Sequence, residues 1–207
     1  KENAGFQQTR GFIRLTRAMV KGLFKDGGLA EKRFLINPYD IDLNDSEMNT
    51  IIKQIKPELA NAISHDIASH GSAIAEQLDN PTQSTDIQDL SKLIFMASLS
   101  TVTGSIVGLT MNETIAYICA PGRNITNLTK SMDELKLRAW YLFFDRDNRL
   151  YFRKVQNVNA KLNDEVRGFS YEQAKLHIKA LLDDKFEPSE KDCYQDLYIF
   201  PSIEEID

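Results

Sequence analysis

Two short aromatic runs on either side of a polar four-residue turn place the tightest constraint on the fold of this chain. Trp140–Phe144 and Leu150–Val155 flank the sequence Asp145-Arg-Asp-Asn148. Apolar runs of this length, joined by turn-forming residues, are typical of a β-hairpin. We therefore predict two antiparallel strands joined at residues 145–148.

Two helical patterns come directly before this hairpin. The first, Met111–Cys119, follows Thr110 and has Glu113 at its third position, which is the pattern of a capping box. The second follows the turn Pro121-Gly122 and has Asn124 as its N-cap. Its apolar residues recur at helical spacing, at Ile125, Leu128, Met132, Leu135 and Ala139. The order helix, turn, helix, hairpin predicts a winged helix, with the second helix in the recognition position and the hairpin as the wing.

The residues before this region predict a set of helices. A first helix is expected over Phe6–Phe24, ended by Gly27-Gly28. One of its faces is apolar and the opposite face carries Arg10, Arg14, Arg17 and Lys21. A short extended stretch is expected over Arg33–Pro38. Three further helices are expected over Glu47–Ile55, Glu58–Leu78 and Thr85–Leu99.

The last part of the chain predicts a helix over Tyr171–Leu182, begun by Ser170, and a strand over Asp196–Phe200. We therefore expect a mostly α chain of the α+β class in three regions. These are a helical region over 1–91, a winged helix over 92–160 and a small, incomplete α/β appendage over 161–207. Because the chain starts at Lys1 and not at a methionine, we interpret it as part of a longer protein.

Charge is unevenly distributed along the chain. Residues 123–161 hold nine basic and four acidic residues, whereas the rest of the chain has a net charge of −10. Local basic surface is what contacts phosphates, so five residues are candidates for binding nucleic acid. They are Lys130, Arg146, Arg149, Arg153 and Lys154. The alternative is that the charges on the hairpin only keep an edge strand soluble.

No set of residues predicts a complete active site in this chain. Gly104-Ser-Ile-Val-Gly108 lacks the Lys-Ser/Thr of a P-loop. His65 and His70 are five residues apart, about 140° around a helix, so they cannot share a metal. We therefore expect no catalytic residue, metal or cofactor here. Two cysteines, Cys119 and Cys193, fit a reducing cytoplasm, and without an 18-residue apolar run no membrane partner is expected.

Several short blocks, in order along the chain, resemble the prokaryotic P-loop ATPase family known as domain of unknown function family 499. The blocks are Thr9–Leu15, Ile36-Asn37-Pro38 with Asp40-Ile41-Asp42, Leu137–Leu142, Asn157–Leu162 and Ile199–Ser202. Members of this family carry their Walker motifs upstream. The resemblance therefore implies a portion that begins after the nucleotide-binding core, with a first region like the helical lid of an AAA+-type ATPase.

The resemblance also implies roles for the first helix. Arg10 would be a sensor arginine that pairs with the γ-phosphate of ATP, and Arg14 is the second candidate. ATP and Mg²⁺ are implied for the parent protein, whose upstream P-loop core would be the partner of this region. The parent would belong to restriction-like or anti-phage gene neighbourhoods. The plain alternative for these arginines is a solvated helix face.

Three functions are thus open from the sequence. The first is a non-catalytic lid and winged-helix portion of a P-loop ATPase, contributing a sensor arginine and a nucleic-acid or protein contact surface. The second is a free-standing winged-helix regulator that binds DNA, and the acidic balance outside residues 123–161 counts against it. The third is a pure protein-interaction module. DNA binding that weakens steeply with salt would separate the second from the third.

Overall fold

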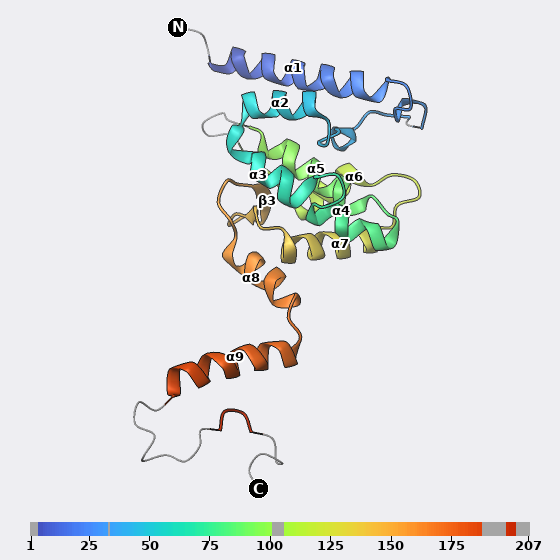
Figure 1. Cartoon of the computed structure of the whole chain (residues 1–207). Helices are drawn as coiled ribbons and strands as arrows, with labels where there is room; N and C mark the ends of the chain where they lie inside the picture. Colours follow the sequence, from blue (N-terminus) through green and yellow to red (C-terminus); the bar gives the residue numbers. More distant parts are fainter. Residues whose placement is uncertain (1–3, 33, 101–105, 188–197, 202–207) are drawn as a thin grey trace. The chain divides into compact units, whose positions relative to one another are not determined.

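A computed structural model describes residues 4–32, 34–100, 106–187 and 198–201 (Figure 1). The chain divides into two compact units, Lys1–Asn163 and Asp164–Asp207, and each is considered by itself. The described residues are mostly helical and include one three-stranded antiparallel sheet. The mostly α class predicted from the sequence is therefore confirmed.

The first unit begins with two helices packed on each other. Helix α1 (Ala4–Leu23) lies against α2 (Ser46–Ile55), as Figure 1 shows. Leu15 is buried, and Gly11 faces Ile55 so closely that a Cβ there would lie 3.3 Å from its side chain. Glycine at this position lets the two helices approach each other. Both helices agree with the sequence prediction.

The segment between α1 and α2 differs from the prediction. It contains short 3-10 turns at Ala30–Lys32 and Pro38–Asp40, and no strand is present among its described residues. The second turn is held by the Asp40 carboxylate, which accepts a hydrogen bond from the backbone N–H of Asn37 at 2.8 Å. Asn37 itself keeps an extended backbone, with φ −110° and ψ 156°, but the chain turns directly after it. Arg33, where that stretch was expected to begin, lies outside the described residues.

The single helix predicted over Glu58–Leu78 is wrong, because this stretch is broken into several short turns. A 3-10 turn at Pro57–Leu59 leads into α3 (Ala60–Ala62) and then a π-helical turn, Ile63–Ile67. A loop follows, and α4 (Ile74–Asp79) and a 3-10 turn at Asn80–Thr82 complete the stretch.

The break is fixed by the backbone of the loop. His70 and Gly71 have φ values of 51° and 95°, which a right-handed helix does not contain. The carboxylate of Glu76 accepts hydrogen bonds of 2.8–3.1 Å from the backbone N–H groups of Ser69, Gly71 and Ala73. These bonds satisfy donors that a helix would otherwise pair, so the loop competes successfully with helix. His70, which lies in this loop and not on a helix, is exposed.

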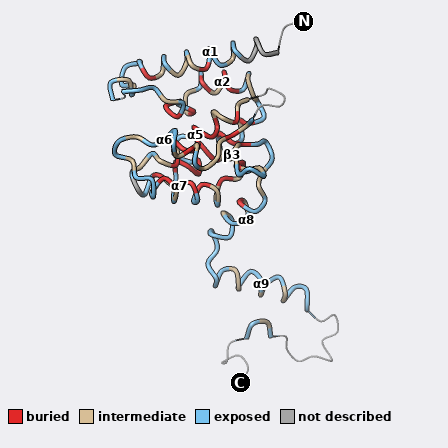
Figure 2. Tube along the Cα trace, turned by 180° about the vertical axis from the view of Figure 1, so that it is seen from behind, coloured by how far each residue is buried: buried red, intermediate tan, exposed pale blue. Residues whose placement is uncertain are grey.

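The centre of the first unit is α5 (Asp86–Ser98), which packs against α4, α6 (Met111–Ile118) and α7 (Ile125–Arg138). Figure 2 shows the buried residues concentrated around α5 and along α7. One core runs from Leu15 of α1 through α5 to the sheet. The predicted regions 1–91 and 92–160 therefore share a single core, and the unit boundary lies at residues 163 and 164.

The sheet has the strand order β1-β3-β2. Strands β2 (Leu142–Phe144) and β3 (Arg149–Phe152) form the predicted hairpin, with Leu142 opposite Phe152. Strand β1 (Leu109–Thr110), which the sequence did not predict, pairs with β3. It follows Gly108, whose φ is +82° and at which a Cβ would lie 2.3 Å from the carbonyl oxygen of Leu150.

The predicted caps and turn are present. The N–H of Glu113 donates to Thr110 Oγ1, and the Glu113 carboxylate accepts from the N–H of Thr110 at 2.8 Å, which completes the capping box of α6. The side chain of Asn124 caps α7. In the hairpin turn, Asp145 Oδ1 accepts from the N–H of Arg149 at 2.9 Å. Asn148 takes a left-handed φ of 56°, which asparagine tolerates well.

The C-terminal part contributes two further helices. Helix α8 (Val158–Arg167), which the sequence did not predict, starts in the first unit and buries Ala160 there. Helix α9 (Tyr171–Phe186) begins with the predicted Ser170 cap, and none of its residues is buried. Of the predicted strand over Asp196–Phe200, residues 196 and 197 lie outside the described part, and residues 198–201 carry no strand.

One buried carboxylate joins the helical part of the first unit to its hairpin. Asp66, in the π-helical turn, is 0% exposed and accepts hydrogen bonds from the backbone N–H groups of Trp140 at 3.0 Å and Tyr141 at 2.7 Å. Its other contact is His65 Nδ1 at 2.7 Å. Burial raises the pKa of Asp66, although these hydrogen bonds act in the opposite direction.

A large amphipathic ring between helix and hairpin is expected to fill that seam and to be largely buried, but Trp140 is only half-buried. Its ring lies 4.0 Å from that of His65, measured between centroids, and the Lys161 ammonium lies 4.7 Å from its centroid. The ring does contact both the π-helical turn and α8. It remains partly open because these polar partners do not enclose it.

We expect Asp66→Ala to lower the free energy of unfolding by about 2–6 kcal/mol. Two buried backbone N–H groups would lose their acceptor, at a cost of about 1–3 kcal/mol each. Asp66→Asn should lose less, because one acceptor oxygen remains. Urea unfolding followed by circular dichroism measures the change. The matched control is Asp147→Ala at an exposed position, which should change the value by less than about 0.5 kcal/mol. Equal effects would contradict the role assigned to Asp66.

Asp79 predicts a pH dependence of stability. Its carboxylate accepts from the N–H groups of Ile87 at 3.0 Å and Gln88 at 2.9 Å, and burial raises its pKa from 3.8 to about 6. Between these pH values the folded chain holds a proton that the unfolded chain has released, so this group stabilises the fold less as pH rises. The stability of the wild type relative to Asp79→Asn should therefore fall from pH 4 to pH 6. A constant difference across that range would contradict this assignment.

Candidate functional site

The hairpin and α7 carry the five residues that the sequence proposed for nucleic-acid contact. Lys130 is exposed on α7, and Arg146 and Lys154 are exposed on the hairpin and just after it. Arg153 is exposed too, but its guanidinium lies over the rings of Phe143 at 5.6 Å and Tyr151 at 5.0 Å. The structure thus brings four of the five residues to one hairpin.

Arg149 holds the sheet to α6. Its guanidinium lies 2.9 Å from the Glu113 carboxylate, donates to the carbonyl oxygen of Gly108 at 2.9 Å, and is 18% exposed. The backbone N–H of Thr110, together with the Arg149 charge, lowers the pKa of Glu113. Arg149 therefore lies between β3, α6 and the start of β1, and its charge is directed at protein groups.

The exposed cations of this surface are mixed with acidic residues. Asp145 and Asp147 lie in the hairpin turn beside Arg146, and Asp133 and Glu134 are exposed on α7. A basic field strong enough to hold a phosphate backbone needs cations gathered on one face. Here they alternate with carboxylates, as the sequence of α7 already indicated.

The two proposed sensor arginines lie on α1. Both Arg10 and Arg14 are exposed, as is Arg17 on the next turn. Lys21, at the end of this basic row, lies 2.8 Å from the Glu47 carboxylate of α2. The structure therefore places the row on the solvent side of α1, where it is open to a further body of protein or to solvent.

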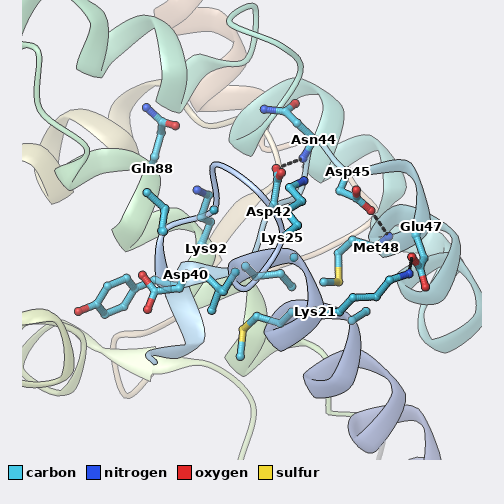
Figure 3. Close-up of a pocket in the computed structure, with 18 of the residues that line it drawn as sticks. Lys21, Lys25, Asp40, Asp42, Asn44, Asp45, Glu47, Met48, Gln88 and Lys92 are labelled. Atoms are coloured by element: carbon cyan, nitrogen blue, oxygen red, sulfur yellow. Dashed lines mark hydrogen bonds and ion pairs between the residues drawn. The ribbon is translucent and has the colours of Figure 1, made fainter. Parts of the chain in front are cut away.

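A polar pocket of about 570 Å³ lies between the end of α1, the segment at residues 39–48 and the start of α5 (Figure 3). Its lining mixes three lysines with five carboxylates: Lys21, Lys25 and Lys92 with Asp40, Asp42, Asp45, Glu47 and Asp89. Several of these carboxylates already bind protein groups. Asp45 caps α2 by accepting from the N–H of Met48 at 2.9 Å, and Glu47 pairs with Lys21. Asp45 and Glu47 therefore serve to hold α1 and α2 in place.

Arg123, in the turn between α6 and α7, pairs with Asp89 of the pocket lining, and sequence reasoning missed its role. Its guanidinium pairs with Asp89, lies 3.7 Å from Asp86, and sits 5.4 Å from the centroid of the Tyr39 ring. Burial would lower the pKa of Arg123, but these two carboxylates raise it above its ordinary value. The ion pair joins residues 34 positions apart, so no local pattern could reveal it.

A second pocket, an apolar groove, also measures about 570 Å³ and lies between α1, residues 36–38, α5, β1 and α6. Among the described residues, no charged side chain lines it: the lining is Phe12, Leu15, Thr16, Met19, Ile36, Asn37, Pro38, Leu93, Met96, Ala97, Leu109 and Tyr117. Phe12 and Tyr117 at its edge are 62% and 61% exposed. The apolar face predicted for the first helix thus serves two purposes, since Leu15 and Leu23 are buried while Phe12 faces the groove.

Two further features bear on chemistry. In the described part of the chain, no group of three or more histidine, cysteine, aspartate or glutamate side chains could hold a metal ion. No helix in that same part is long and apolar enough to cross a bilayer. Cys119, at the end of α6, is exposed.

Comparison with known proteins adds no relative. The chain matches no protein-family model, no curated protein and no solved structure. Function is therefore argued from the surfaces described above.

Proposed function

We propose that the chain is a non-catalytic lid and winged-helix portion of a prokaryotic P-loop ATPase, and that it acts through protein contact. The observation that carries the protein-contact part is the apolar groove beside α1, whose described lining residues are all uncharged. Open apolar patches on a protein surface can mark protein interaction sites. The cations of the hairpin are weaker support for nucleic-acid contact, because Arg149 is bound to Glu113 and the others alternate with carboxylates.

The winged-helix part of the proposal is supported by the order of elements. Helix α5 is followed by β1, α6, α7 and the β2–β3 hairpin, and the strands lie in the order β1-β3-β2. This is the element order of a winged helix, with α7 in the recognition position. The caps at Thr110 and Asn124 support the same division into two helices.

The ATPase part rests on the resemblance of the short blocks, the first of which lies on α1. Arg10 and Arg14 are exposed there, a position from which a side chain can reach a nucleotide held by another part of the protein. In this proposal Arg10 is the sensor arginine, and ATP and Mg²⁺ are bound by the upstream core. The role within restriction-like or anti-phage systems belongs to the same proposal.

We expect residues 1–207 to bind no Mg-ATP at micromolar affinity and to hydrolyse none. Exposed arginines meet a hydrated triphosphate only as surface ion pairs, each contributing about 0–1 kcal/mol, whereas millimolar affinity already needs about 4 kcal/mol. Titration calorimetry and phosphate release measure both. Tight binding would contradict the assignment as a portion without its core.

In the longer protein, Arg10→Ala should remove hydrolysis and leave nucleotide binding mostly intact, because γ-phosphate contacts act chiefly in the transition state. The matched control is Arg17→Ala, on the same exposed side of α1, which should leave hydrolysis unchanged. Loss of hydrolysis in both variants, or in neither, would contradict the role proposed for Arg10.

Binding of DNA by α7 and the hairpin is the second candidate, favoured by the exposure of Lys130, Arg146 and Lys154. If this candidate is right, the affinity for duplex DNA falls steeply with salt. The double variant Arg146→Ala/Lys154→Ala should then weaken binding equally for all DNA sequences, because its contacts go to phosphates. We expect gel-shift titrations to show binding no tighter than about 10⁻⁶ M, the level of non-specific contact. Nanomolar, salt-sensitive binding would favour this candidate over protein contact.

A further inference from the structure

An apolar projection lies beside the apolar groove. Phe34 is 105% exposed and Leu35 is 74% exposed, while the next residue, Ile36, lines the groove itself. A single exposed apolar residue is ordinary on a protein surface. Here two consecutive exposed apolar residues adjoin an open apolar groove. One small patch therefore contains both projecting side chains and a groove that could receive them.

We propose that a second copy of this chain covers the groove, with Phe34 and Leu35 of each copy inserted into the groove of the other. The proposal rests on the protein-contact part of the proposed function and is independent of its ATPase part. A two-fold interface between identical chains requires that the same patch supply both members of each contact. The patch formed by Phe34, Leu35 and the groove meets that requirement.

The short distance between projection and groove makes the two insertions compatible. Phe34 and Ile36 are two residues apart, which is at most about 7 Å of extended chain. Both parts therefore lie close to one two-fold axis, and the two insertions take place in the same encounter.

The chemistry of the groove also favours this occupant. The part of its lining that the structure describes contains no charged side chain, and Phe34 and Leu35 are likewise uncharged and apolar. A buried aromatic side chain removes about 150–250 Å² from water. Phe12 (62% exposed), Tyr117 (61%) and Phe34 (105%) can therefore together supply a substantial part of the about 800 Å² that each partner buries in a standard interface.

The test is the oligomeric state of the full 207-residue chain, measured by light scattering and sedimentation over roughly 1–100 µM, a range that spans micromolar dissociation constants. We expect a concentration-dependent dimer. Phe34→Asp should raise its dissociation constant at least tenfold. The matched control is Phe24→Asp, which replaces another exposed phenylalanine, 70% exposed at the end of α1 and outside the groove lining, and should leave the dimer intact.

A complementation experiment tests the reciprocal contact. Thr16→Trp, on the α1 side of the groove, should fill it and weaken self-association while leaving the projection in place. Mixed with Phe34→Asp, which retains an open groove, it should form heterodimers with one insertion restored. Each variant alone should remain monomeric at the same concentration. Circular dichroism checks that each is folded, and Leu35→Asp replaces Phe34→Asp if that variant loses its helical signal.

Three results would overturn the proposal. They are a monomeric wild type throughout the concentration range, a dimer that Phe34→Asp leaves unchanged, and equal loss of dimer in Phe24→Asp. A chain that stays monomeric and binds a foreign peptide in its groove would also overturn the proposal. Tight Mg-ATP binding by residues 1–207 would contradict the ATPase assignment and leave the dimer result standing, so the two failures are distinguishable.

Discussion

The arrangement of the first unit depends on the buried carboxylate of Asp66. It sits in a π-helical turn and accepts the backbone N–H groups at the start of the hairpin, 74 and 75 residues further along the chain. A buried acceptor that satisfies two backbone donors fixes both position and direction, which apolar packing alone does not. The helical N-terminal part and the α5–β3 part are for this reason one body with one core.

Local signals predicted the local elements well. The capping box at Thr110, the Asn124 cap and the turn at Asp145 each specify a helix start or a hairpin within a few residues, and each is present. The single helix expected over Glu58–Leu78 does not form, although its apolar spacing is compatible with a helix. The reason is that the Glu76 carboxylate binds the backbone of the loop. A carboxylate that acts on backbone groups several residues away leaves no periodic signal.

The candidate surfaces were harder to predict, because their character depends on partners distant in sequence. The sequence did not distinguish Arg149 from Arg146, but in the structure Arg149 is largely buried and pairs with Glu113. Arg123 counted only as one more positive charge until its pairing with Asp89 appeared. Phe12 belonged to a regular apolar stripe, but the helix it lies on is only partly covered, so the same stripe forms both core and open groove. Composition and spacing do not separate these outcomes.

Asp79 also bears on how the chain is connected. Its carboxylate binds the first turn of α5 from the end of α4, so the two helices are held together by more than the peptide between them. Asn80, Pro81 and Gln83 in that connection are exposed. A protease cut there would leave both ends anchored in the core, and new termini could be opened at the same place in a circularly permuted chain.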